Sequence, residues 1–297
     1  MTNTNLKDSI KNFVKVNRAV IAKQIKHLQE TYYIYPTVAI LCNFNNSSSV
    51  AYMNSIIKAC ENTDLEYSII HIEDRSELDV IEIIKRLNND NNLHGIIVTL
   101  PLSKQFNTRR VLNTIDPLKD IDCVTDVNIG KLFTGKPRYY PCTPMAIVNW
   151  LVDSNVRLSG MNIVVVGRSD IVGKPLATIL TQKDATVTLC HSKTQGLQGI
   201  CKDADIVITA IGQPKMLTTD YFTLNTLIID AGINVLEDGS ICGDVDYDNV
   251  KNIEGVTLTP VPNGIGRITT SMVVENCVLA AQKQIDKRLL QIALGDI

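Results

Sequence analysis

The chain has 297 residues, of which 45% are apolar and 20% charged, and its 29 basic and 31 acidic residues leave a net charge of −2. The length suggests two domains of roughly 150 residues each. The near-neutral charge argues against a nucleic-acid partner, and no apolar run approaches the ~20 residues of a membrane helix. The N-terminus lacks an apolar signal-peptide core. We therefore expect a cytoplasmic protein that binds neither nucleic acid nor membrane.

The eight cysteines are scattered along the chain, and none forms a C-x-x-C pair. The four histidines show no metal-ligand spacing either. Several cysteines stand in apolar, strand-like runs, where cysteine commonly behaves as a small buried hydrophobe. This pattern favours free thiols over disulfides and predicts no metal site.

Hydrophobic periodicity in the first half of the chain alternates between helix and strand. Helices are expected over 7–30, 47–63 and 78–87. Strand-like apolar runs occupy 37–44, 67–72 and 95–100. The segment 117–144 is rich in Pro, Gly, Asp and Thr and has no clear period.

A second alternation follows a helix-like stretch at 144–152. Strands are expected over 162–166, 186–190, 205–211 and 226–229, and a long closing helix over 269–288. Short strands separated by helices imply parallel pairing through right-handed crossovers. We predict two α/β units with a boundary near 145–160, and a last helix that folds back onto the first unit.

The sharpest local feature is the turn that follows the apolar run 162–166, where Gly167 and Gly173 bracket five residues. Glycines allow close backbone approach, and a helix N-terminus offers N–H groups to a phosphate. The turn lacks the G-x-G-x-x-G spacing, so an ordinary strand–helix turn stays an alternative. It is not a P-loop, because Pro175 follows Lys174 where Ser or Thr is required.

The next expected strand ends in Cys190-His191-Ser192-Lys193-Thr194. NAD-preferring dinucleotide folds usually carry an acid there that holds the ribose 2′-hydroxyl. None is present, whereas Ser192, Lys193 and Arg168 could donate to a 2′-phosphate. We therefore expect NADP rather than NAD as the cofactor.

Several longer motifs then occur in the order found in one family. They are Leu100-Pro101-Leu102, Lys119-Asp120-Ile121-Asp122, Tyr140-Pro141-Cys142-Thr143-Pro144, the Gly167–Pro175 turn, Gly212-Gln213-Pro214, Ile229-Asp230-Ala231-Gly232-Ile233-Asn234, Gly243-Asp244-Val245 and Thr259-Pro260-Val261-Pro262. The chain resembles the bifunctional methylenetetrahydrofolate dehydrogenase/cyclohydrolase (FolD) family over essentially its whole length. The resemblance implies a folate domain at 1–145 completed by a C-terminal helix at 270–297, a Rossmann domain at 146–269, a cleft between them, and usually a homodimer.

The family oxidises 5,10-methylenetetrahydrofolate by hydride transfer to NAD(P)+, and many members then hydrolyse the methenyl product to 10-formyltetrahydrofolate. By resemblance, Tyr52 packs against the folate, and Asp122 holds the polar edge of the pterin. The resemblance assigns further substrate contacts to Ser49, Leu100, Pro101, Pro262, Gly264 and Gly266. It assigns cofactor contacts to Gly167, Arg168, Ser169, Gly173, Ser192 and Ile233.

The sequence departs from the family at the group used for hydrolysis. The family motif places a catalytic lysine four residues after the tyrosine, on the same helix face, and here that position is Ile56. Lys58 lies six residues after Tyr52 and points about 120° away on an ideal helix. The glutamine that normally hydrogen-bonds the lysine is replaced by Thr99.

Two smaller departures lie near the expected site. Cys123 stands where glycine usually follows the aspartate, and 262–267 reads Pro-Asn-Gly-Ile-Gly-Arg in place of Pro-Gly-Gly-Val-Gly-Pro. Asparagine tolerates left-handed backbone better than other non-glycine residues, so Asn263 is expected to keep the loop. Arg267 adds a charge whose role the sequence does not define.

Three hypotheses follow. The first is an NADP-dependent methylenetetrahydrofolate dehydrogenase whose cyclohydrolase activity is weak or lost. The second is a fully bifunctional enzyme in which another group or a water replaces the lysine. The third is a catalytically silent protein that binds folate or NADP.

Overall fold

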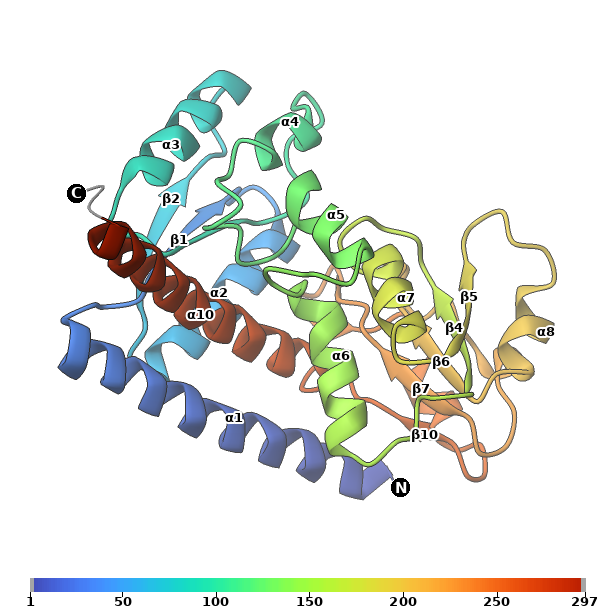
Figure 1. The fold of residues 1–297 in the computed structure, drawn as a ribbon. Helices are drawn as coiled ribbons and strands as arrows, with labels where there is room; N and C mark the ends of the chain where they lie inside the picture. Colours follow the sequence, from blue (N-terminus) through green and yellow to red (C-terminus); the bar gives the residue numbers. More distant parts are fainter. Residues whose placement is uncertain (1–2, 295–297) are drawn as a thin grey trace. The chain divides into compact units, whose positions relative to one another are not determined.

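The computed structural model describes residues 3–294, and side chains over residues 6–291. The chain divides into two compact units (Figure 1). One comprises 3–15 and 141–269, and the other 16–140 and 270–294. Both contain a parallel sheet with helices, so the expected α/β class is confirmed.

The unit of residues 16–140 and 270–294 is built on a three-stranded parallel sheet in the order β2-β1-β3. Its strands are β1 (Thr37–Cys42), β2 (Glu66–His71) and β3 (Gly95–Val98). Its helices are α2 (Ser47–Glu61), α3 (Glu77–Asn89), α4 (Thr108–Leu112), α5 (Asp126–Phe133), most of α1 (Asn3–Tyr32) and most of α10 (Ile265–Leu294).

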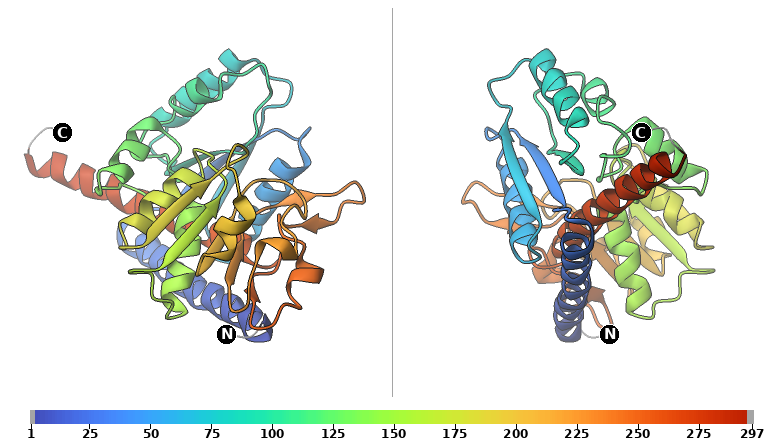
Figure 2. Two further views of the ribbon diagram at one scale, coloured as in Figure 1. Left: turned by 90° about the vertical axis from the view of Figure 1, so that its right-hand side faces the viewer. Right: turned by 60° about the vertical axis from the view of Figure 1, so that its left-hand side comes forward.

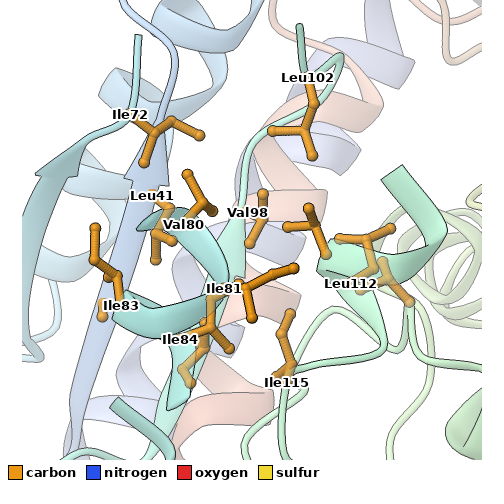
Figure 3. Packing of buried hydrophobic residues seen from close by; sticks show 14 of the residues in the cluster. Leu41, Ile72, Val80, Ile81, Ile83, Ile84, Val98, Leu102, Leu112 and Ile115 are labelled. Atoms are coloured by element: carbon orange, nitrogen blue, oxygen red, sulfur yellow. The ribbon is translucent and has the colours of Figure 1, made fainter. Parts of the chain in front are cut away.

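The core of this unit forms where β1 and β3 meet α3 and α4 (Figure 3). Alternate strand residues such as Leu41 and Val98 face isoleucines and valines of α3, because successive strand side chains point to opposite faces. Helix α3 starts at a capping box in which Ser76 and Asp79 satisfy each other's backbone amides. Burial of this apolar surface drives the packing.

The second unit carries a five-stranded parallel sheet in the order β10-β7-β6-β4-β5. Its strands are β4 (Asn162–Val166), β5 (Thr186–Cys190), β6 (Ile206–Thr209), β7 (Leu227–Asp230) and β10 (Thr257–Leu258). Its helical elements are α6 (Cys142–Asp153), α7 (Gly173–Thr181), α8 (Leu197–Lys202), the 3-10 turn η1 (Thr219–Tyr221) and α9 (Tyr247–Val250). An antiparallel hairpin of β8 (Asn234–Val235) and β9 (Ile241–Cys242) projects from the sheet (Figure 2).

The chain reverses its direction of progress across this sheet at β4. The connection through α7 leads to β5 on one side of β4, and the later strands β6, β7 and β10 lie on the other side. In such sheets, ligands bind outside the carboxyl ends of the strands at this switch point. The topology therefore places a candidate cofactor site above the ends of β4 and β6.

The structure corrects several expected boundaries. The expected strands at 37–44, 95–100 and 205–211 each end earlier, because the chain turns into the loops that carry polar site residues. The segment 117–144, which has no clear period, contains helix α5. That helix has eight residues and is capped by the preceding Thr125, whose side chain accepts a hydrogen bond from the Asn128 backbone amide, so a cap rather than periodicity marks it.

Candidate functional site

Helix α2 is tied at its start to the segment after β3. The Asn46 side chain accepts a 2.8 Å hydrogen bond from the Ser49 amide and caps the helix. The Ser49 hydroxyl is buried and donates to the Leu100 carbonyl at 3.2 Å. Two expected substrate residues, Ser49 and Leu100, are therefore in contact and fix α2 against the carboxyl end of β3.

Tyr52 and Ile56 lie one helical turn apart on α2. Tyr52 is half-buried, whereas Ile56 is 0% exposed. Lys58 lies on the exposed face of the helix. The position expected to hold a catalytic lysine is thus part of the hydrophobic core, and Lys58 lies on a different, exposed face of the helix.

Thr99 immediately follows β3 and is fully buried. Its backbone amide donates to the Leu41 carbonyl at 2.9 Å, and its hydroxyl donates to the same oxygen at 3.2 Å. The Leu100–Pro101 peptide bond that follows is cis, and Pro101 is exposed. The hydroxyl proton of Thr99 is therefore used to satisfy the end of β1.

Burial also shapes the thiol next to Thr99. Desolvation raises the pKa of Cys42, and a hydrogen bond with the Thr99 side chain opposes that shift. The thiol is therefore kept protonated at neutral pH, which makes it a poor nucleophile.

Asp122 is half-buried at the end of a loop that the neighbouring Asp120 anchors. Asp120 is fully buried, and its carboxylate accepts hydrogen bonds from the amides of Val124 and Thr125 at 2.9 Å, from the Thr125 hydroxyl at 2.6 Å and from the Asn128 amide group at 2.8 Å. These donors fix the backbone on both sides of Asp122. Asp120 therefore positions the loop that carries Asp122, a role that the motif Lys119-Asp120-Ile121-Asp122 does not reveal.

Cys123, the residue after Asp122, has a backbone conformation that favours glycine. Cys123 has a φ of +56°, a left-handed conformation in which glycine has no steric penalty. The side chain is buried, and burial raises the pKa of the thiol. Cys123 therefore keeps the turn that presents Asp122, at a conformational cost of about 1 kcal/mol.

Two further contacts hold this loop. The Lys119 ammonium is buried and donates to the Leu87 carbonyl at 2.8 Å and the Asp90 carbonyl at 2.5 Å. From α10, the Asn276 side chain donates to the carbonyls of Ile121 at 2.7 Å and Tyr140 at 2.9 Å. The loop that carries Asp122 is therefore held by several contacts from within its own unit.

The glycine turn after β4 is packed without spare space. Gly167 has a φ of +129°, and a Cβ there would lie 2.3 Å from the Ala210 carbonyl oxygen at the end of β6. A Cβ on Gly173 would lie 1.8 Å from the Gly167 carbonyl oxygen. Both positions require glycine, which brings the backbone of β4, β6 and α7 together at the switch point.

The amides at the start of α7 are partly occupied. The Ser169 hydroxyl accepts hydrogen bonds from Val172 at 3.1 Å and Gly173 at 3.3 Å, and its carbonyl accepts one from Lys174. Lys174 itself forms an ion pair with Asp170. The expected free N–H groups are thus engaged by Ser169, so the exposed Ser169 shapes the turn as well as bordering the candidate site.

The carboxyl ends of β4 and β5 present exposed donors side by side. The Gly167 amide donates to the Cys190 carbonyl at 2.9 Å, which aligns the loops that follow the two strands. After β5 a tight turn is closed by a hydrogen bond from the His191 amide to the Thr194 hydroxyl. Arg168 and Ser192 are exposed beyond these strands, as is Lys193. The turn after β5 contains no acid, and these donors fit a phosphorylated ribose.

The loop before α10 lies next to Ile233. Gly266 is close enough that a Cβ on it would meet the Ile233 side chain at 3.5 Å, and a Cβ on Gly264 would lie 2.1 Å from the Pro260 carbonyl oxygen. Asn263 has a φ of +75°, which confirms the expected left-handed role. Pro262 and Arg267 are exposed. These expected substrate residues belong to the unit of the five-stranded sheet, whereas Tyr52 and Asp122 belong to the other.

Other site types receive no support. Within residues 3–294 there is no group of three or more His, Cys, Asp or Glu side chains arranged to hold a metal ion. Over the same range, no helix combines the length and apolar character needed to cross a bilayer. All eight cysteines are free thiols, and all but Cys242 are buried.

Comparison with known families decides the assignment. Residues 7–122 match the catalytic domain of the tetrahydrofolate dehydrogenase/cyclohydrolase family, and residues 141–285 match its NAD(P)-binding domain. The chain belongs to this family. The bifunctional protein FolD of Clostridium beijerinckii is 41% identical over 279 residues, covering 94% of each chain.

Solved structures agree. The bifunctional FolD enzyme of Campylobacter jejuni superposes with a TM-score of 0.86 at 33% identity, covering 93% of this chain and 98% of that one. The FolD of Trypanosoma brucei, solved with NADP and an inhibitor, gives a TM-score of 0.86 at 30% identity over 92% of this chain and 96% of that one. The chain is thus a dehydrogenase/cyclohydrolase family enzyme with a C-terminal NAD(P)-binding domain.

Proposed function

We propose that this protein oxidises 5,10-methylenetetrahydrofolate to 5,10-methenyltetrahydrofolate with NADP+, and that its cyclohydrolase activity is weak or lost. The observation that carries the second part is the burial of Ile56, which occupies the position of the family's catalytic lysine with a side chain that cannot exchange a proton. We assign folate binding to the unit of 16–140 and 270–294, and cofactor binding to that of 3–15 and 141–269. We also propose a cytoplasmic homodimer.

For the dehydrogenase step, the protein chiefly has to align its substrates. Asp122 supplies a carboxylate that accepts hydrogen bonds from the N–H groups of the pterin, and the buried Asp120 beneath it holds the loop in place. The ring of Tyr52 packs against the folate. NADP+ accepts the hydride when bound, and Arg168 with Ser192 supplies donors for its 2′-phosphate.

Hydrolysis makes an additional demand, because protons must move around an attacking water and a tetrahedral carbon. Ile56 provides no ionisable group, and the Thr99 hydroxyl already donates to the Leu41 carbonyl. Neither position therefore supplies a group that exchanges protons with water, while the turn around Gly167 and Gly173 is closely packed. These observations support a dehydrogenase that releases its methenyl product.

A fully bifunctional enzyme is the second candidate, favoured by the match to relatives named bifunctional. The substitute group of interest is His71, which ends β2 in register with Cys42 of β1. Its Nδ1 lies 3.0 Å from a Glu73 carboxylate oxygen, and its ring stacks on Phe44 with centroids 4.0 Å apart. A histidine oriented by a carboxylate is a common proton-transfer group.

The deciding experiment supplies 5,10-methylenetetrahydrofolate and NADP+ and follows methenyl- and 10-formyltetrahydrofolate separately. We expect methenyltetrahydrofolate to accumulate. Conversion to the formyl form at a rate matching oxidation would refute the proposed loss of hydrolysis. NADP+ and folate binding by calorimetry without any NADPH formation would instead identify a silent binding protein.

The variant Ile56→Lys restores the missing group, and we expect a gain in hydrolysis of about 100-fold or more, the scale typical of one general acid–base group. Ser55→Lys adds the same charge on the exposed face of α2 and is the matched control. Retained dehydrogenase activity shows that each variant is folded. If Ile56→Lys changes nothing while His71→Gln abolishes hydrolysis, the bifunctional alternative is correct.

The cofactor preference and the assembly are tested independently. The ratio of kcat/KM for NADP+ and NAD+ measures the first, and we expect NADP+ to be preferred. Sedimentation equilibrium measures the second, and a monomer at micromolar concentration would refute the homodimer.

A further inference from the structure

Two buried acids at the carboxyl edge of the five-stranded sheet have no role in the function proposed above. Asp230 is the last residue of β7, and Asp244 lies in the segment that follows β9. Asp244 is 0% exposed and Asp230 is 3% exposed. Buried carboxylates are costly unless donors surround them, so their partners indicate what they do.

The Asp244 carboxylate joins two loops. One oxygen accepts a hydrogen bond from the Ile211 amide at 2.7 Å. The other accepts from the Gln213 amide at 2.9 Å and from the Asn234 side chain at 3.0 Å. Ile211 and Gln213 follow β6, and Asn234 follows β7. A single side chain therefore fixes the spacing of the loops beyond two neighbouring strands.

Asp230 in turn holds Asp244. One of its oxygens accepts from the Asp244 amide at 3.1 Å and from the Gly232 amide at 2.9 Å, and the other accepts from the Val245 amide at 2.9 Å. Burial raises the pKa of Asp230 to about 6, opposed by these amides and reinforced by the negative charge of Asp244. The segment that carries Asp244 is thus anchored to the end of β7.

Two glycines of this region lie directly against the two carboxyl groups, where no larger residue would fit. A Cβ on Gly232 would lie 2.3 Å from the carboxyl carbon of Asp244, and one on Gly243 would lie 2.0 Å from an Asp230 oxygen. Ile233 stands between Gly232 and Asn234. The Asn234 side chain donates to Asp244, and a Cβ on Gly232 would clash with it. The side chain of Ile233 itself is 44% exposed. The backbone on both sides of Ile233 therefore lies against Asp244.

We propose that Asp244 is a positioning residue for the nicotinamide half of the cofactor. The inference rests on the proposed NADP-dependent function. The donors for the adenosine 2′-phosphate lie beyond β4 and β5, so a dinucleotide stretched along the carboxyl edge places its other half beyond β6 and β7. Those are the loops that Asp244 ties together, and the residue contacts the cofactor only through them.

The test compares whole NADP+ with adenosine 2′,5′-bisphosphate, which contains the adenosine half alone. In Asp244→Asn, the side-chain amide keeps its size but turns one acceptor into a donor, so one of the facing N–H groups loses its partner. We expect the Kd for NADP+ and kcat to worsen about tenfold or more. The Kd for adenosine 2′,5′-bisphosphate and the KM for the folate are expected to stay within about twofold.

A milder variant guards against misfolding. Asn234→Ala removes only the hydrogen bond from the Asn234 side chain to Asp244 and leaves the bonds from the Ile211 and Gln213 amides intact. We therefore expect the Kd for NADP+ to rise by about threefold, in proportion to one lost hydrogen bond. Asp248→Asn alters an exposed carboxylate of the same unit that pairs with Lys251. It should leave the Kd for both ligands unchanged. Measurements use the full chain and isothermal calorimetry.

The outcomes separate the two proposals. An equal loss of affinity for NADP+ and for adenosine 2′,5′-bisphosphate in Asn234→Ala would overturn the role of Asp244. Unchanged NADP+ affinity in both Asp244→Asn and Asn234→Ala would overturn it as well. Failure of the unmodified protein to bind NADP+ or adenosine 2′,5′-bisphosphate would instead refute the proposed function. Loss of NADP+ affinity and kcat with an intact adenosine site supports the positioning role.

Discussion

Lowering the pH is expected to destabilise the unit of residues 16–140 and 270–294 through one buried histidine. His94 immediately precedes β3 and is 4% exposed. Its Nδ1 accepts a 3.2 Å hydrogen bond from the Thr37 amide at the start of β1. Burial is the largest of the causes that together lower the pKa of His94 from 6.5 to about 4; the positive charges of Lys119 and Arg288 contribute to this shift, and the negative charge of Asp90 opposes it.

The sign follows from linkage. The unfolded chain takes up a proton at His94 near pH 6.5, whereas the folded chain resists it down to about pH 4. The stability due to neutral His94 is therefore present above pH 6.5 and is lost as the pH falls toward 4. A difference of about 2.5 pKa units corresponds to roughly 3 kcal/mol in full, of which about 2 kcal/mol is lost between pH 7 and pH 5.

The assay measures the free energy of unfolding of the full chain in urea at pH 7 and pH 5, for the parent and for His94→Gln. Glutamine cannot be protonated but can accept from the Thr37 amide, so its pH dependence should be flatter by about 2 kcal/mol. His27→Gln replaces an exposed histidine and is the control, with a pH dependence equal to that of the parent. The C–H resonances of the imidazoles, followed by NMR, report the titration of His94 directly.

The result that would refute this reasoning is an equal pH dependence for the parent and His94→Gln. An NMR titration of His94 near pH 6.5 would refute the desolvated environment itself. A flatter curve for both histidine variants would show that the effect does not depend on the buried site.

Three further variants test the candidate cofactor site beyond β4 and β5 and the loop that carries Asp122. Gly173→Ala places a methyl group against the Gly167 carbonyl oxygen and is expected to weaken NADP+ binding by at least tenfold in calorimetry, whereas Gly199→Ala, which meets nothing within 4 Å, should leave it unchanged. Asp120→Asn puts an amide among buried N–H donors, so the free energy of unfolding should fall by about 2–4 kcal/mol and the midpoint of thermal unfolding should fall with it. The same variant should raise the KM for the folate while the Kd for NADP+ stays unchanged, and a raised Kd for NADP+ would contradict the assignment. Ser192→Asp adds a negative charge where the 2′-phosphate is expected, so steady-state kinetics should show kcat/KM for NADP+ falling about tenfold or more with that for NAD+ retained; equal losses for both would argue against this location.

The glycine turn after β4 was more predictable from the sequence than the loop that carries Asp122. The expected strands at 162–166 and 186–190 coincide with β4 and β5, because buried parallel strands read as continuous apolar runs bounded by turn residues. Gly167 and Gly173 were identifiable because their spacing after a strand is local. The occupation of the α7 amides by Ser169 was not, since it depends on how the turn closes in space.

In the unit of residues 16–140 and 270–294, the sequence predicted neither the short helix α5 nor the hydrogen bonds that support the Asp122 loop. Eight residues contain too few turns for a periodic signal, and α5 is defined by its cap at Thr125. Asp120 and Asp122 look alike in sequence, yet one is fully buried and anchors the loop while the other is half-buried. Their difference arises from donors at 124–128, which a motif does not reveal.

What the sequence determined by itself is the set of local decisions: apolar runs that become strands, glycines that permit tight turns, the absence of an acid after β5, and an isoleucine at position 56. Tertiary structure alone decided which polar groups share a partner. Asp244 joins residues 211, 213 and 234, and Asn276 reaches residues 121 and 140, across separations that no local pattern records. The physical reason is that a buried polar group must find a partner wherever the fold supplies one.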